Sequence, residues 1–257
     1  MHFYDEIGIR RVLNAAGSMT YIGGSLIHPE VLEAMRQAAS AYVFIEDLLS
    51  WASTEISIQT GAEAALVTTG TTGGLVLASA ACLTGMDPER MSNLPNTAGI
   101  PNQFIMQKQH RISFDHAVRV AGGTIVEVGE QHQTQLVDIK SAINEHTAAI
   151  LHMALDPLPT VQLSDVVTIA RKYDLPIIVD AAAELPPVRN LRSFLDEGAD
   201  LVIYSGGKAI CGPNDSGILC GRKDLIDAAR AQAYPNPGIG RSLKVSKEQI
   251  VGLVYAL

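Results

Sequence analysis

The chain has 257 residues, 47% of them apolar, and a formal net charge of -8, so it can bury a substantial core, while an acidic surface disfavours nucleic acid as a partner. No apolar stretch reaches the roughly 18 residues of a membrane span, and the N-terminus lacks the basic-then-apolar pattern of a signal peptide. We therefore expect a cytoplasmic protein that does not enter a membrane.

The first 60 residues differ in pattern from the rest of the chain. They contain a small-residue loop at 14–18, followed by helical stretches at 29–42 and 46–60. We expect this segment to form an arm that packs across the rest of the domain or across a partner subunit.

From residue 62 onward, short apolar runs alternate with helical patterns. The runs predict seven strands, at 64–68, 104–107, 124–128, 149–153, 177–180, 201–204 and 217–220. The intervening patterns predict helices at 72–83, 113–121, 136–144, 163–173 and 222–233, with Ser164 as the cap of the fourth. Because the runs are apolar on successive residues, the strands should be covered on both faces. The sequence thus predicts a three-layer α/β/α fold with a mostly parallel, seven-stranded sheet.

Two segments interrupt or follow this alternation. Residues 87–102 contain Pro88, Pro95 and Pro101 and are expected to form an insertion loop. The final stretch has helical spacing and a plausible cap at Ser246, yet it runs to residue 257 without a helix stop signal. The chain therefore looks cut short.

The three cysteines, Cys82, Cys211 and Cys220, are odd in number and have no metal-ligand spacing. Each lies in an apolar or glycine-rich context, which is typical of a reduced, packed thiol. We expect neither disulfides nor a metal site.

A glycine- and threonine-rich segment, 68–74, follows the first predicted strand and opens an apolar helix. Free backbone amides at the positive end of a helix dipole favour an anion, and here a cofactor phosphate fits, because no Gly-Lys-Ser/Thr of a nucleotide loop ends the segment. The alternative is a glycine-rich turn with a threonine cap.

A carboxylate and a lysine follow two later strands. Asp180 ends the strand at 177–180, and Lys208 follows the next strand in the segment Tyr204-Ser205-Gly206-Gly207-Lys208. Pyridoxal phosphate requires both groups, since a lysine forms a Schiff base with its aldehyde and a carboxylate keeps its pyridine nitrogen protonated. The structural alternatives are a helix cap at Asp180 and a surface lysine in a turn.

Further candidates carry weaker signals. His110 lies just past the strand at 104–107, where its flat ring could stack on a cofactor, although a lone histidine is more often structural. Arg241 and Lys244 follow a proline-glycine turn and could bind a substrate or cofactor anion, or simply be solvated.

Together, residues 68–74, His110, Asp180 and the lysine segment resemble fold type I pyridoxal phosphate enzymes, the aspartate aminotransferase superfamily. More narrowly, the chain is similar to the branch of bacterial selenocysteine synthases, the L-seryl-tRNA(Sec) selenium transferases, and the related D-glucosaminate-6-phosphate ammonia lyases. The segments that carry this resemblance are 12–17, 61–67, 123–129, 199–208 and 244–248.

The resemblance implies roles for individual residues. Lys208 would hold the cofactor and move the α-proton, and Asp180 would pair with the pyridinium nitrogen. His110 would stack on the ring. The phosphate would be held by Gly70, Thr71 and Thr72, with Ser205 as an additional donor, and the substrate would be bound by Arg241 and Asn14.

The resemblance also implies a domain plan and an assembly. Residues 1–60 would be an N-terminal arm with helices, and residues 61–240 the pyridoxal phosphate-binding large domain. Residues 241–257 would be the start of a linker helix to a small C-terminal domain that we expect this chain to lack. Family members form dimers or higher homo-oligomers with active sites at the subunit interface, so residues 14–20 would reach a neighbour's cofactor. The tRNA-gripping N-terminal domain of selenocysteine synthases has no counterpart here, which disfavours tRNA as a substrate.

These residues lead to one main hypothesis and two alternatives. The main one is a lyase that releases ammonia from a 2-amino-3-hydroxy acid, of the sugar-acid type, and leaves a 2-keto-3-deoxy acid. The first alternative keeps the cofactor but carries out selenium or sulfur transfer, aldol cleavage or racemisation. The second is a catalytically silent domain that binds the cofactor or a partner.

Overall fold

The computed structural model describes residues 2–154 and 160–257. Its strands form one seven-stranded sheet in the order β1-β7-β6-β5-β4-β2-β3. The strands are β1 Ala64–Thr69, β2 Gln103–Gln107, β3 Thr124–Val128, β4 Thr147–Met153, β5 Ile177–Asp180, β6 Leu201–Ser205 and β7 Ser216–Gly221. All seven predicted strands are confirmed to within two residues at each end. Strand β7 runs antiparallel to both of its neighbours, and the remaining pairs are parallel.

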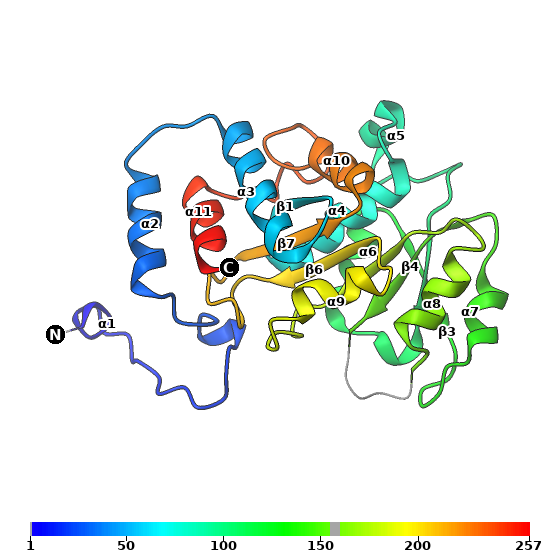
Figure 1. Cartoon of the computed structure of the whole chain (residues 1–257), viewed down its shortest axis with the longest axis horizontal. Helices are drawn as coiled ribbons and strands as arrows, with labels where there is room; N and C mark the ends of the chain where they lie inside the picture. The colour runs from blue at the N-terminus through cyan, green and yellow to red at the C-terminus, as the bar shows by residue number, and fades with distance from the viewer. Residues whose placement is uncertain (1, 155–159) are drawn as a thin grey trace.

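Helices lie on both faces of this sheet (Figure 1). In the described residues they are α1 Phe3–Glu6, α2 Pro29–Ala39, α3 Ile45–Thr60, α4 Gly70–Thr84, α5 Pro88–Asn93, α6 His116–Val120, α7 Leu136–Ala142, α8 Leu163–Ala170, α9 Asn190–Asp196, α10 Lys223–Gln232 and α11 Lys247–Ala256. The α/β class predicted from the apolar runs is therefore confirmed.

Several local predictions need correction. The insertion at 87–102 contains helix α5, because Asp87 accepts hydrogen bonds from the amides of Glu89 and Arg90. Ser164 does not cap α8, since the N-cap is Gln162 and Ser164 lies inside the helix. Helix α9 was not predicted at all.

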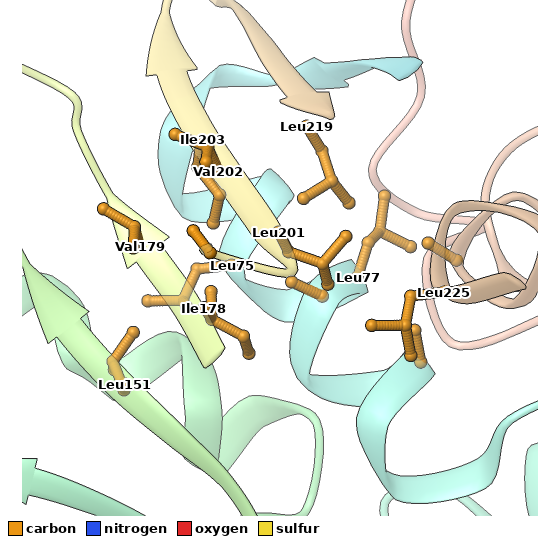
Figure 2. Packing of buried hydrophobic residues seen from close by; sticks show 14 of the residues in the cluster. Leu75, Leu77, Leu151, Ile178, Val179, Leu201, Val202, Ile203, Leu219 and Leu225 are labelled. Atoms are coloured by element: carbon orange, nitrogen blue, oxygen red, sulfur yellow. The ribbon is translucent and has the colours of Figure 1, made fainter. Parts of the chain in front are cut away.

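The core forms where α4 packs against the centre of the sheet. Nearly every residue of α4 from Gly73 to Thr84 is buried, as expected for a helix that is apolar on all sides. Leu75 and Leu77 of α4 lie among side chains of β5 and β6, including Ile178 and Leu201 (Figure 2). Strands β4, β5 and β7 are buried at every position, which explains why their sequences are continuous apolar runs rather than alternating ones.

Helix α2 of the N-terminal segment packs along α11, the last helix of the chain (Figure 1). The amine of Lys247 donates hydrogen bonds to the carbonyls of Ala38 and Ala41, the latter at 2.7 Å, and so satisfies acceptors at the C-terminal end of α2. The amide of Gln249 donates to the hydroxyl of Ser246, which confirms the predicted cap of α11. Helix α3 packs on β1, so part of the predicted arm is joined to the sheet.

The register of the sheet brings four strand ends to one edge. Met153 at the end of β4 pairs with Asp180 at the end of β5, and Asp180 pairs with Ile203 of β6. Because β7 is antiparallel to both β1 and β6, the ends of β1 and β6 point the same way, and Thr69 lies opposite Ser216. Ligands of such sheets bind beyond the carboxyl ends of the strands.

Candidate active site

A cavity of about 360 Å³ opens at this edge of the sheet. Its walls come from the ends of β1, β4, β5 and β6, from the first turn of α4, and from the N-terminal arm. Of the residues predicted to form a site, the cavity is lined by Gly70, Thr71, Thr72, Asp180, Ser205 and Lys208. The fold therefore brings together six side chains or backbone positions that lie up to 138 residues apart in the sequence.

Lys208 lies on a tight turn that begins where β6 ends. A Cβ atom on Gly207 would lie 2.4 Å from the Cα of Asn214, and one on Gly206 would lie 2.1 Å from the Ser216 hydroxyl. Two chain segments therefore approach too closely for any residue with a side chain, which is the physical reason for the Gly-Gly pair before the lysine. The arm secures the same turn, because the amide of Ser25 donates to the carbonyl of Gly207 at 3.1 Å.

Asp180 lies deeper in the cavity, with 5% of its surface exposed. Its Oδ1 atom accepts a hydrogen bond from the amide of Ala182 at 3.0 Å. Burial raises the pKa of this carboxyl, while the Ala182 hydrogen bond and the positive charge of Lys208 act in the opposite direction. A cation placed against Asp180 would therefore relieve the cost of burying its charge.

The third wall is the start of α4, where Gly70 adopts a φ of +61°. Thr69 occupies the N-cap position but makes no capping hydrogen bond with its side chain, and the Thr68 hydroxyl instead donates to the carbonyl of Gly70 at 2.9 Å. The threonine cap that was the structural alternative is therefore not formed. The first turn of α4 contributes Gly70, Thr71 and Thr72 to the cavity lining, and the free amides of a helix N-terminus suit an anion.

His110 is placed differently from the prediction. It is fully buried and does not line the cavity, although its neighbours Ile112 and Met153 do. Its Nδ1 atom accepts the amide of Met153 at 3.2 Å, and its ring meets His152 edge to face at 4.7 Å. Burial lowers the pKa of His110 to about 4. In this arrangement its ring supports the end of β4 from behind the cavity wall.

The two predicted substrate-binding residues also lie outside the cavity lining. The guanidinium of Arg241 stands 5.1 Å from the centre of the Tyr234 ring, and the amine of Lys244 stands 5.4 Å from it. The carbonyl of Lys244 accepts the hydroxyl of the cavity residue Thr69 at 3.4 Å, so this basic segment passes close to the start of α4. Asn14 is exposed and holds its own loop together, donating to the carbonyl of Gly17 at 2.6 Å.

Several residues line the cavity that were not predicted to lie there. Ser18, Met19 and Thr20 line the cavity of their own chain, whereas the resemblance had placed this stretch at a neighbour's cofactor. Glu184 enters from the turn after β5, and Asn214 enters from the turn before β7. A carboxylate four residues after Asp180 could have been noticed. The approach of the arm to the cavity of its own chain could not, because it depends on the path of the chain.

Two absences hold for residues 2–154 and 160–257. None of the helices there is both long and apolar enough to cross a membrane, and no group of three or more histidine, cysteine, aspartate or glutamate side chains is arranged to hold a metal ion.

Comparison with known proteins gives a consistent set of similarities. Residues 110–257 match the family model described as SelA, L-seryl-tRNA selenium transferase. The chain is 40% identical to D-glucosaminate-6-phosphate ammonia lyase of Salmonella typhimurium strain 14028s, over all of this chain and 69% of that protein. It is 37% identical to 5'-C-glycyluridine monooxygenase-decarboxylase of a Streptomyces species, over 99% of this chain and 64% of that protein. A solved structure of D-glucosaminate-6-phosphate ammonia-lyase superposes with a TM-score of 0.93 at 39% identity, covering all of this chain and 69% of that one.

Proposed function

The chain belongs to the SelA family of L-seryl-tRNA selenium transferases, and on that premise we propose that it is a pyridoxal phosphate-dependent ammonia lyase. Its substrate is a 2-amino-3-hydroxy acid, of which D-glucosaminate 6-phosphate is the leading candidate, and its products are a 2-keto-3-deoxy acid and ammonia. The observation that carries this proposal is the presence of Lys208 and Asp180 on one cavity, in a chain that aligns along its whole length with an ammonia lyase.

The residues of the cavity fit pyridoxal phosphate at three points. The buried Asp180 carboxyl, whose pKa is raised by burial, gains a partner if a protonated pyridine nitrogen lies against it. The first turn of α4, including Gly70, Thr71 and Thr72, offers amides and hydroxyls to a phosphate, and Ser205 adds a hydroxyl. Lys208 supplies the amine for the aldehyde. We propose that residues 61–240 form the cofactor-binding domain.

When bound, the cofactor acidifies the α-hydrogen of an attached amino acid by accepting electrons into its ring. Side chains of the protein would move the proton, balance the charge and exclude water. Lys208 holds the position of a general base, because its turn is fixed between Asn214 and the arm. The carboxylate of Asp180, at the buried base of the cavity, supplies the negative charge that would compensate a protonated pyridine nitrogen. Ser18, Met19 and Thr20 form part of the cavity wall, and such a wall would keep water from the reacting groups.

Arg241 and Asn14 remain our proposals for substrate binding. The support for Arg241 is its place on the basic segment whose Lys244 carbonyl contacts Thr69, together with the 6-phosphate in the name of the similar lyase. The described residues form no ion pair with Arg241 or Lys244. Both cations are therefore available for a substrate phosphate at the rim of the cavity.

A second candidate function is group transfer to a bound dehydrated amino acid, which the matching family model favours. Transfer to a tRNA-linked serine is opposed by the net charge of -8, because a polyanion is repelled by an acidic surface. The two reactions differ in product. Release of ammonia with a keto acid supports the lyase, whereas a selenium- or sulfur-containing amino acid supports transfer.

Homo-oligomeric assembly and a cytoplasmic location also remain proposals. The support for assembly is the large exposed apolar surface of the N-terminal segment, where Leu13, Leu26 and Tyr42 are almost fully exposed. Light scattering of the purified protein gives the oligomer number, and a monomer at micromolar concentration would contradict the assembly.

The decisive experiment compares wild-type protein with Lys208→Ala. The wild type is incubated with pyridoxal phosphate, reduced with borohydride and digested, and we expect the cofactor on the peptide that contains Lys208. Ammonia and keto acid are then measured with D-glucosaminate 6-phosphate and a panel of 2-amino-3-hydroxy acids, and the variant should lose about 100-fold or more of the rate. Unchanged release by Lys208→Ala would show that another group moves the α-proton.

A further inference from the structure

The cavity contains a second carboxylate whose role neither the cofactor nor the general base accounts for. Among the described residues that line it, three have a side chain that is an acid or a base in water, namely Asp180, Glu184 and Lys208. Asp180 lies at the buried base of the cavity with 5% exposure, while Glu184 is half-buried. The two carboxylates therefore occupy different environments within one site.

The backbone of Glu184 is held from two sides. Its amide donates to the carbonyl of Ala181 at 3.2 Å, which closes the turn after β5. Its carbonyl accepts the side-chain amide of Asn190 at 2.7 Å. The carbonyl of Asn190 in turn accepts the hydroxyl of Tyr204 at 2.8 Å.

Tyr204 ties this arrangement to the lysine. It is a fully buried residue of β6, the strand that leads into the Lys208 turn. One strand thus anchors both the lysine turn and, through Asn190, the turn that carries Glu184. The backbone of Glu184 is therefore held by the rigid part of the fold, which is what a group that acts in catalysis requires.

The proposed elimination requires two proton transfers on neighbouring carbon atoms. A base must take the α-proton, and an acid must protonate the β-hydroxyl, because hydroxide leaves poorly without a proton. Lys208 serves the first transfer. Asp180 would pair with the nitrogen of the bound cofactor, and the serine and threonine hydroxyls of the cavity are too weakly acidic for the second.

We propose that Glu184 is the acid that protonates the departing hydroxyl, a role that rests on the proposed lyase function. The electron pair of the Cα–H bond forms the new carbon-carbon double bond as the α-proton moves to the amine of Lys208. The C3–O bond breaks with its electron pair on oxygen, the carboxyl proton of Glu184 moves to that oxygen, and water leaves. Glu184 remains as a carboxylate and regains a proton from solvent before the next turnover.

The test separates the two proton transfers with a single substrate, D-glucosaminate 6-phosphate, in heavy water. Ammonia release reports loss of the hydroxyl, and deuterium at the α-carbon of recovered substrate reports the step of Lys208. In Glu184→Gln we expect ammonia release to fall about 100-fold and the ratio of deuterium uptake to ammonia release to rise at least about tenfold. Glu184→Asp, which keeps the acid, should recover part of the release rate.

The matched control is Glu197→Gln, at an exposed glutamate just after α9, which should leave both rates unchanged. Urea unfolding of every variant checks that the fold is retained. If Glu184→Gln releases ammonia at the wild-type rate, or if exchange and release fall in parallel, the assignment of Glu184 is wrong. A wild-type protein that exchanges the α-proton but releases no ammonia would instead overturn the lyase function, and this role with it.

Discussion

Asp180 and Lys208 face one cavity from the ends of two adjacent parallel strands, β5 and β6. Burial raises the pKa of the Asp180 carboxyl, and the charge of Lys208 partly offsets that rise. The two residues are 28 positions apart in the sequence, and they meet at one cavity because neighbouring parallel strands end at the same edge of a sheet. This relationship places an acid and a base where one planar cofactor could meet both.

Replacing Asp180 by asparagine should reduce catalysis more than cofactor binding. The amide oxygen of asparagine still accepts the Ala182 amide, but the negative charge against the pyridine nitrogen is lost. We expect cofactor attachment to Lys208 to persist and ammonia release to fall by about 100-fold or more. Absorbance titration and the ammonia assay measure the two effects, and an unchanged rate of release would contradict the pairing.

Replacing Gly207 by alanine should distort the lysine turn. The new Cβ would lie 2.4 Å from the Cα of Asn214 and 2.7 Å from its carbonyl oxygen, and backbone atoms cannot move away cheaply. We expect a loss of about 1–3 kcal/mol in the free energy of unfolding, together with impaired cofactor attachment. Gly212→Ala is the matched control on the same turn, because its Cβ meets nothing closer than 3.3 Å. Equal urea midpoints for the two variants would refute the steric argument.

Replacing Arg241 by alanine should weaken binding of a phosphorylated substrate. We expect at least a roughly tenfold rise in KM for D-glucosaminate 6-phosphate, little change in kcat, and little change in KM for the unphosphorylated sugar acid. Arg119→Ala, which removes an exposed arginine of α6, serves as the control. Steady-state kinetics with both substrates measure these changes. An equal rise in KM for the phosphorylated and the unphosphorylated substrate would show that Arg241 does not bind the phosphate.

The buried histidines should make the fold sensitive to acid. Burial lowers the pKa of His110 to about 4, and burial together with the neighbouring His110 lowers that of His152 to about 3. Both values lie below 6.5, so the unfolded chain binds more protons, and stability is lost as the pH falls from about 6.5 towards the folded values. The raised pKa of Asp180 acts in the opposite direction.

His152→Gln isolates one part of this effect. The loss of unfolding free energy between pH 7 and pH 5 should be smaller in this variant by about 1–2 kcal/mol. Urea unfolding at both pH values gives the two differences. His146→Gln removes an exposed histidine and should leave the pH dependence as it is in the wild type. If the unfolding free energy of His152→Gln falls between pH 7 and pH 5 by as much as that of the wild type, His152 does not titrate as a buried group.

Much of the fold could be predicted from local patterns. Each strand was visible as an apolar run, because a strand covered on both faces needs apolar residues at successive positions. The Ser246 cap was visible because a capping box depends on residues only three apart. Helix α5 was missed and the cap of α8 was wrongly assigned to Ser164, since proline-rich and serine-containing segments are compatible with more than one local structure.

Part of the candidate site could likewise be predicted from the sequence, and part could not. Lys208, Asp180 and the start of α4 could be named because each follows a recognisable strand and because the sequence resembles a known family. The positions of Glu184 and Asn214 in the cavity were not named, because both residues enter it through turns that leave no periodic signal. Residues 18–20 were expected at a cofactor from the resemblance, but at that of a neighbour, whereas they line the cavity of their own chain. His110 has a strand-end position like that of Asp180, yet it is turned towards His152.

The sequence by itself determined where the strands lie along the chain, which helix is buried, and which two residues define the proposed chemistry. It could do so because burial and strand ends are properties of short segments. Only the tertiary structure decided which other groups share the cavity. That choice depends on strand order, on the antiparallel β7 and on the contact between the arm and Gly207. Each of these joins residues that are distant along the chain, so no local pattern could specify them.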